Sequence, residues 1–109
     1  LVIPRNHFTD PCEFLNLHAA NFAAAVYMAR AIINLEVSTD LIPAYDGLTM
    51  GFNHGAAAGQ TIEHVHFHVI PRRFGDVENP RGGIRNVIPW LGDYTQGQYS
   101  DPKMVPKKR

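Results

Sequence analysis

Three histidines alternate with apolar residues near the middle of the chain. The segment reads His64-Val65-His66-Phe67-His68. On a β-strand, side chains two residues apart project to the same side, roughly 6.5–7 Å apart along the strand. The alternation therefore predicts a strand with three imidazoles on one face. Its apolar face is expected to pack against a helix.

Imidazoles in this arrangement fit nucleophilic chemistry at phosphorus. A histidine that attacks a phosphate forms a covalent phosphoramidate, which splits one difficult displacement into two easier ones. The attacking nitrogen must be unprotonated, and a hydrogen bond from the other ring nitrogen to a carbonyl would fix that tautomer. A zinc site also stays open, because neutral imidazole is a common zinc ligand. Isolated histidines are most often structural or surface residues, but strict alternation of three fits that interpretation poorly.

Polar residues just before the histidines supply candidate hydrogen-bond donors. Charge that develops on phosphoryl oxygens in a transition state needs donors close by. Gln60, Thr61 and Asn53 carry suitable side chains. Taken alone, Asn53 also fits a turn cap and Thr61 an edge-strand residue. Gln60, at the start of the histidine strand, has no evident packing role.

Two alternating segments are expected to form the sheet that carries these side chains. Residues 47–53 alternate apolar with small or polar side chains, and residues 62–70 alternate again until Pro71 ends them. The segments are close in sequence and are expected to pair antiparallel. A short strand is expected at residues 1–4, and a further one is compatible with residues 84–88.

One long helix is predicted between the first strand and the sheet. Apolar residues recur at three- and four-residue spacing over residues 17–36. Asp10 and Pro11, with Glu13 three residues after Asp10, form a helix-start signature. Asn16 offers a second cap, so the sequence leaves two starting points open.

Length and composition indicate one compact domain. The chain has 109 residues, of which 45% are hydrophobic and 18% charged, with a formal net charge of +0. No global charge points to nucleic acid or to an anionic membrane. The single cysteine, Cys12, excludes an internal disulfide and favours a reducing, cytoplasmic location. The missing initial Met predicts a fragment, and the basic tail (Lys103, Lys107–Arg109) is expected to be disordered.

The segment around the histidines, GFNHGAAAGQTIEHVHFHVIPR at residues 51–72, resembles the signature of the histidine triad (HIT) family. Two flanks agree. Residues 1–7 (LVIPRNH) resemble the end of the family's second strand. Residues 76–85 (DVENPRGGIR) resemble the C-terminal stretch of the branch of diadenosine tetraphosphate hydrolases. The resemblance covers about residues 1–90.

The resemblance implies a role for each matching residue. His66 takes the place of the nucleophile, His68 that of a phosphate contact and His64 that of an orienting residue. Gln60 would bridge the α-phosphate and leaving-group oxygens. The remaining matches are substrate-binding positions, namely Asn53, Gly59 and Thr61. A nucleotidyl group, usually AMP or GMP, would pass to His66 and then to water or another acceptor.

The resemblance also implies an architecture and a set of partners. The expected fold is α+β, an antiparallel sheet with one long helix packed on it. The HIT domain would span residues 1–90, without the family's first strand and helix, and residues 91–109 would be a flexible extension. The expected substrate is a dinucleoside polyphosphate or a nucleoside phosphoramidate, with no cofactor and with homodimerisation. The alternative is a non-catalytic nucleotide-binding or scaffolding module.

Other histidines and arginines are expected to be ordinary surface residues. His7 matches a position where zinc-containing relatives place a ligand, but their two cysteine ligands have no counterpart, so no metal is predicted. His18 and His54 are expected on the surface. The arginines that follow the histidines fit a polyphosphate contact but are more commonly solvated: Arg72, Arg73, Arg81 and Arg85.

Overall fold

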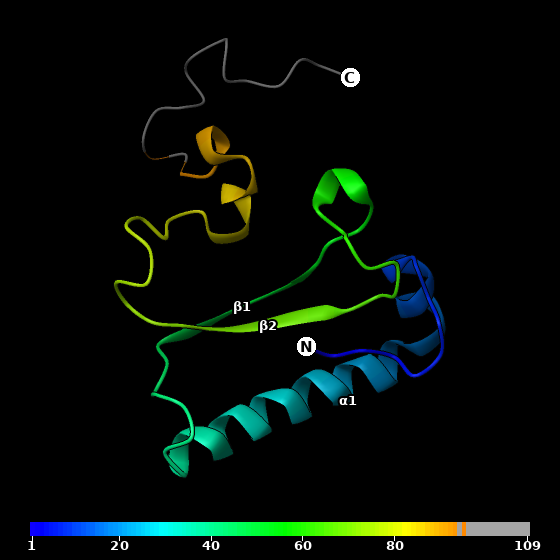
Figure 1. The fold of residues 1–109 in the computed structure, drawn as a ribbon, viewed down its shortest axis with the longest axis horizontal. Helices are drawn as coiled ribbons and strands as arrows, with labels where there is room; N and C mark the ends of the chain where they lie inside the picture. Colours follow the sequence, from blue (N-terminus) through cyan, green and yellow to red (C-terminus); the bar gives the residue numbers. More distant parts are fainter. Residues whose placement is uncertain (94, 96–109) are drawn as a thin grey trace. The chain divides into compact units, whose positions relative to one another are not determined.

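The computed structural model describes residues 1–93 and 95. Two compact units are present, Leu1–Arg73 and a second that begins at Phe74. The first unit is α+β, with one long helix, α1, and a two-stranded antiparallel sheet of β1 and β2 (Figure 1). This confirms the predicted fold class. No helix among the described residues is long and apolar enough to cross a membrane. The basic tail lies outside the described residues.

Helix α1 spans Pro11–Ser38, so the earlier of the two predicted starting points is the correct one. The Asp10 side chain accepts a hydrogen bond from the Cys12 N–H at 2.8 Å, and Pro11 occupies the first turn, where its missing N–H costs nothing. At the other end, the Thr39 N–H donates to the Leu35 carbonyl. Local capping chemistry thus fixes both ends of the helix.

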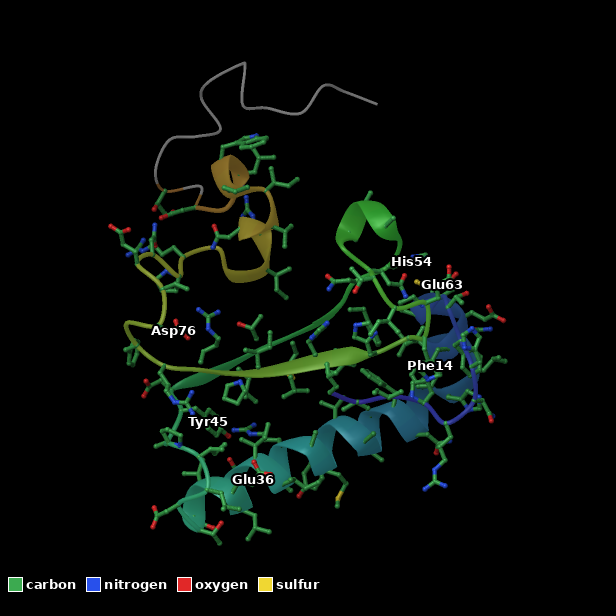
Figure 2. All side chains as sticks on the ribbon, viewed as in Figure 1. Phe14, Glu36, Tyr45, His54, Glu63 and Asp76 are labelled. Carbon is green, nitrogen blue, oxygen red and sulfur yellow. The ribbon has the colours of Figure 1, made fainter. Side chains whose placement is uncertain are left out.

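The helix is kinked at His18, which has non-helical backbone angles (φ −134°, ψ 30°). Its ring lies 5.6 Å from that of Phe8 and 5.8 Å from that of Phe14. His18 is half-buried, so it is less exposed than the expected surface position. The kink turns the imidazole into an aromatic cluster at the start of α1, where Figure 2 shows Phe14.

The cap at Asp10 provides a first test of the fold. Changing Asp10 to alanine is expected to lower the free energy of unfolding by about 1 kcal/mol, because the Cys12 N–H loses its acceptor. Asp10→Ser, which keeps a capping oxygen, should stay close to wild type. Urea unfolding followed by circular dichroism measures both variants. Equal losses for alanine and serine would show that the cap contributes nothing.

Strands β1 (Gly47–Phe52) and β2 (Phe67–Arg72) pair antiparallel, as predicted. Phe52 lies opposite Phe67, and Gly51 lies opposite His68. Directly opposed residues share a face, so the phenylalanines lie on one side of the sheet and His68 on the other. Gly51 has no side chain, which leaves room for the His68 ring on that face.

The predicted bounds of the histidine strand are wrong: β2 begins at Phe67 instead of residue 62, and it includes Pro71 instead of ending before it. The N–H and C=O of Phe67 both bond to Val2, on the side away from β1. Backbone groups alternate sides along a strand, so residue 71 also points away from β1. Pro71 therefore removes no hydrogen bond from the β1–β2 ladder.

The N-terminal segment lies against residues 65–67. Val2 and Phe67 exchange two backbone hydrogen bonds of 2.8 Å, and the Val65 N–H donates to the Phe8 carbonyl at 2.6 Å. The strand expected at residues 1–4 is therefore reduced to a single bridge, Val2–Phe67. These contacts hold residues 65–67 in place at the point where the chain enters β2.

The core of the first unit is aromatic. The buried apolar residues in the described part of the chain include Phe14, Val65 and Phe67. The Phe22 ring of α1 lies 4.9 Å from Phe67 and 5.5 Å from Phe52. Phe67 thus faces the helix and Val65 is buried, as the alternation predicts, and His66 between them is turned to the other side.

The second unit contains short 3-10 helices instead of the strand proposed at residues 84–88. They span Gly83–Val87 (η2) and Pro89–Leu91 (η3). The Arg85 N–H donates to the Gly82 carbonyl at 2.9 Å, which is a local turn bond. A strand needs a partner, and no strand lies among the described residues of this unit. Buried Asp93 accepts a hydrogen bond from the Asn79 amide at 2.9 Å.

Candidate active site

His66 and His68 lie together on the sheet face opposite the core. Their ring centroids are 5.0 Å apart with an interplanar angle of 70°, and both side chains are half-buried. His68 belongs to β2, whereas His66 immediately precedes it. The alternation between His66 and His68 therefore places two imidazoles at one site, as predicted for a strand.

One hydrogen bond determines the tautomer of the His66 ring. Its Nδ1 lies 2.9 Å from the His64 carbonyl oxygen. A carbonyl only accepts, so Nδ1 must carry the proton. In the neutral ring, Nε2 then holds the lone pair, as nucleophilic attack requires.

The His64 ring makes a different set of contacts. Its Nε2 lies 2.7 Å from the Pro4 carbonyl oxygen, and its Nδ1 lies 3.3 Å from Nδ1 of His7. The ring is thus bound to the N-terminal segment. The structure therefore brings the rings of His66 and His68 together, whereas His64 contacts His66 through its backbone carbonyl.

Gln60 closes the loop that connects β1 to the histidines. Its Oε1 accepts a hydrogen bond from the Gly55 N–H at 2.8 Å, across a short 3-10 helix, η1 (Ala56–Ala58). Gly55 (φ 85°) and Gly59 (φ 88°) have backbone conformations that favour glycine. The Gly55 bond holds the Gln60 amide through its oxygen, so the amide nitrogen, Nε2, takes no part in closing the loop.

Two buried nitrogens lack a partner among the described residues. They are Nε2 of Gln60 and Nε2 of His68. Buried polar atoms are almost always hydrogen-bonded, and the exceptions occur where a ligand or water completes the bond. Both nitrogens belong to residues predicted to contact phosphate, and each has a hydrogen-bonding capacity that the described residues leave unused.

Asn53 and Thr61 have a weaker structural basis. Asn53 is half-buried just beyond the end of β1, and Thr61 is exposed, as is Gly59. Neither side chain makes a hydrogen bond in the part of the chain that the structure describes. Their assignment as substrate-binding residues stays a prediction.

A family model for the HIT domain matches residues 1–75, which include the whole histidine segment. The chain belongs to the HIT family. It is 36% identical over 88 residues to an uncharacterised HIT-like protein of Methanocaldococcus jannaschii, covering 80% of this chain and 63% of that one. No solved structure gives a significant match.

Two further relatives of this HIT domain match shorter stretches of the chain. A bis(5'-adenosyl)-triphosphatase of Dictyostelium discoideum is 56% identical over 34 residues, 31% of this chain and 23% of the relative. Protein hit of Bacillus subtilis is 38% identical over 73 residues, 66% of this chain and 46% of the relative. The chain spans less than two thirds of the length of each of these relatives.

The described residues of this HIT domain do not fit a closed zinc site. No group of three or more His, Cys, Asp or Glu side chains converges on one point within residues 1–93 and 95. His7 and His64 supply two nitrogens, whereas a structural zinc takes four ligands.

The arginines after the histidines mostly stabilise the fold. Arg72 Nη1 donates to the Thr49 hydroxyl at 3.0 Å. Arg73 donates to the backbone carbonyls of Pro43 and Ala44. Arg85 donates to the Leu91 carbonyl at 3.3 Å. Three of the four candidate arginines thus bond to other parts of the chain, a role that neither the polyphosphate contact nor the solvated surface predicted.

Sequence reasoning missed the contacts from outside the triad. Pro4 and His7 bond the His64 ring, although they lie 60 and 57 residues away in the chain. Gly55 orients Gln60. The sequence assigns His7 only to a zinc-ligand position. Pro4 and His7 do stand in the same N-terminal motif, which is a signal for these contacts.

Proposed function

We propose that this HIT domain transfers a nucleotidyl group to His66 and then to water, cleaving the substrate at its α-phosphorus. The observation that carries the proposal is the Nδ1 bond of His66 to the His64 carbonyl, which leaves Nε2 free to attack. The orphaned Nε2 atoms of His68 and Gln60 support it as donors for phosphoryl oxygens.

The reaction then proceeds in two displacements. In the first, the Nε2 lone pair of His66 forms a bond to the α-phosphorus, and the bond from phosphorus to the leaving group breaks; the leaving group takes its electron pair and a proton from solvent. In the second, water attacks the phosphorus, the nitrogen–phosphorus bond breaks, and the proton of water is released to solvent. Nδ1 keeps its proton throughout, held by the His64 carbonyl.

Dinucleoside polyphosphates and nucleoside phosphoramidates are the proposed substrates. Both present a nucleotidyl phosphorus with a departing group, and both fit a site whose described residues supply nitrogen donors. The Dictyostelium relative is named a bis(5'-adenosyl)-triphosphatase, which supports the first class. A non-catalytic nucleotide-binding module is the second candidate, because the same donors would also hold a nucleotide without turnover.

A turnover assay distinguishes the two candidates. The chain is incubated with diadenosine tetraphosphate or adenosine phosphoramidate, with and without a chelator, and released AMP is measured. The proposal expects catalytic AMP release from at least one substrate, unchanged by the chelator. Nucleotide binding without AMP release favours the non-catalytic module, and loss of activity with the chelator favours a zinc enzyme.

Gln60 offers a prediction about the donors. Gln60→Glu keeps an oxygen for the Gly55 N–H but replaces the orphaned Nε2 with a negative oxygen. We expect kcat to fall by about 10²- to 10³-fold, as for other lost transition-state donors. Gln60→Ala loses both contacts and serves as the comparison in steady-state kinetics. Wild-type kcat in Gln60→Glu would remove Gln60 from the site.

We also propose that two copies of the chain associate. Strand β1 pairs only with β2 in the described residues, so its outer edge is free. Large apolar side chains are exposed along α1: Met28, Ile32 and Leu35. Joining β1 edges between copies would pair the free edge, and the exposed side chains of α1 offer further apolar surface toward an interface of about 1,200–2,000 Å². Sedimentation velocity tests this, with a dimer expected and a monomer at all concentrations as the contrary result.

A reducing compartment, the cytoplasm, is the proposed location. Cys12 is free and exposed. Such thiols persist where glutathione keeps them reduced. Fractionation of the native source is the corresponding measurement.

A further inference from the structure

We propose that His7 is a positioning residue for the nucleophile, acting through the His64 ring; this rests on the proposed function of His66. Three hydrogen bonds form the connection. The His7 and His64 Nδ1 atoms lie 3.3 Å apart, His64 Nε2 lies 2.7 Å from the Pro4 oxygen, and the His64 carbonyl accepts from His66 Nδ1 at 2.9 Å.

The direction of each bond follows from donor and acceptor chemistry. The Pro4 carbonyl only accepts, so His64 Nε2 carries the proton. In a neutral His64 ring, Nδ1 then has only a lone pair and must accept. The proton between the two rings therefore belongs to His7 Nδ1, and His7 is the donor. Both nitrogens of the His64 ring are engaged, which fixes its tautomer and its orientation.

The bonds of the His64 ring to His7 and Pro4 form a clamp on this ring, and the backbone around His64 explains why the clamp matters. Residues 62–64 form a bend, and β2 begins only at Phe67, so the His64 carbonyl lies outside the ladder of the sheet. The neighbouring Val65 N–H is held by the Phe8 carbonyl at 2.6 Å. The His64 ring, packed 5.3 Å from the His7 ring, provides the other restraint on this bend.

The consequence is a division of roles among the histidines. His7 holds the His64 ring, the His64 carbonyl holds His66 Nδ1–H, and His66 Nε2 is left as the nucleophile. Small displacements of a nucleophile cost up to about 10²-fold in rate. Losing the His7 donor should therefore reduce kcat without removing any group that contacts the substrate.

The experiment compares three variants by two readouts. His7→Leu removes the donor, His7→Asn restores an N–H at the position of Nδ1, and His54→Leu removes an exposed histidine outside this connection. The first readout is kcat and KM for diadenosine tetraphosphate. The second is the ring-nitrogen NMR spectrum of ¹⁵N-histidine-labelled protein, which reports the tautomer of each imidazole without turnover.

We expect His7→Leu to lower kcat by about 10- to 100-fold with KM nearly unchanged. Its spectrum should show His66 in mixed tautomers, while His7→Asn and His54→Leu keep wild-type kinetics and the Nδ1–H form. Thermal melting confirms that each variant is folded. If the wild-type chain has no turnover, the proposed function fails, but the spectra still test the clamp.

Three results would overturn the assignment of His7. The first is an unchanged His66 tautomer in a folded His7→Leu protein. The second is a His7→Asn variant as impaired as His7→Leu. The third is stoichiometric zinc in the purified wild-type chain by elemental analysis, because two Nδ1 atoms at 3.3 Å would then share a metal instead of a proton.

Discussion

Replacing His66 with alanine is expected to reduce kcat by about four to six orders of magnitude, the scale seen when other enzymes lose their nucleophile. The variant lacks the Nε2 atom that forms the covalent bond, and no other described residue offers the same tautomer-fixed nitrogen. His66 is half-buried and its side chain bonds to one backbone carbonyl, so the fold should lose only about 1 kcal/mol.

The matched control is His54→Ala, which removes an exposed histidine from the β1–η1 loop (Figure 2). It should retain wild-type kinetics and melting temperature. Steady-state assays and calorimetry on both variants separate chemistry from folding. A purely structural triad predicts a different result, namely a His66 variant that melts early, by about 1–3 kcal/mol, yet binds nucleotide normally when folded.

The second large effect is expected at Phe67. Phe67→Ala should cost about 3–5 kcal/mol, because it leaves a cavity beneath the rings of Phe22 and Phe52, each 4.9 Å away. Whole domains are stable by only about 5–15 kcal/mol. The variant is therefore expected to be partly or wholly unfolded at room temperature.

Ile70 provides the comparison for Phe67. It lies on the same strand but on the other face and is 45% exposed, so Ile70→Ala should change stability by less than about 1 kcal/mol. Urea titration followed by far-ultraviolet circular dichroism gives both free energies of unfolding. A Phe67→Ala protein as stable as Ile70→Ala would mean that the aromatic cluster is not the core.

Local chemistry made part of the fold predictable. The Asp10 side chain caps the Cys12 N–H two residues further on, and Pro11 occupies the first turn. Residues adjacent in the sequence therefore determine where α1 begins. The alternation in β1 predicted its bounds to within one residue, Gly47–Phe52 against 47–53. Signals of this kind are contained in a short window of sequence.

The errors arose where partners decide the outcome. Pro71 stays inside β2 because the backbone of residue 71 points away from β1, where the ladder needs no N–H. The pairing of Phe67 with Val2 shows which way this backbone points, and these two residues lie far apart in the sequence. Residues 84–88 contain three β-branched residues but have no strand to pair with in the described part of their unit, so they form turn bonds instead. Neither fact is visible in the local pattern.

The candidate site shows the same division. Alternation correctly placed His66 and His68 on one face, because the period of a strand is a local property. The alternation also predicts the His64 ring on this face, but the structure binds that ring to His7, 57 residues away in the chain. Long-range hydrogen bonds of this kind follow from the fold as a whole.

The covalent intermediate is the most direct test of the central claim. The chain is mixed with diadenosine tetraphosphate, denatured within milliseconds to seconds, and analysed by intact-protein and peptide mass spectrometry. We expect one added adenylyl group per chain, located on His66 and absent from His66→Ala. Turnover with no adduct at any quench time, or an adduct on another residue, would contradict the account.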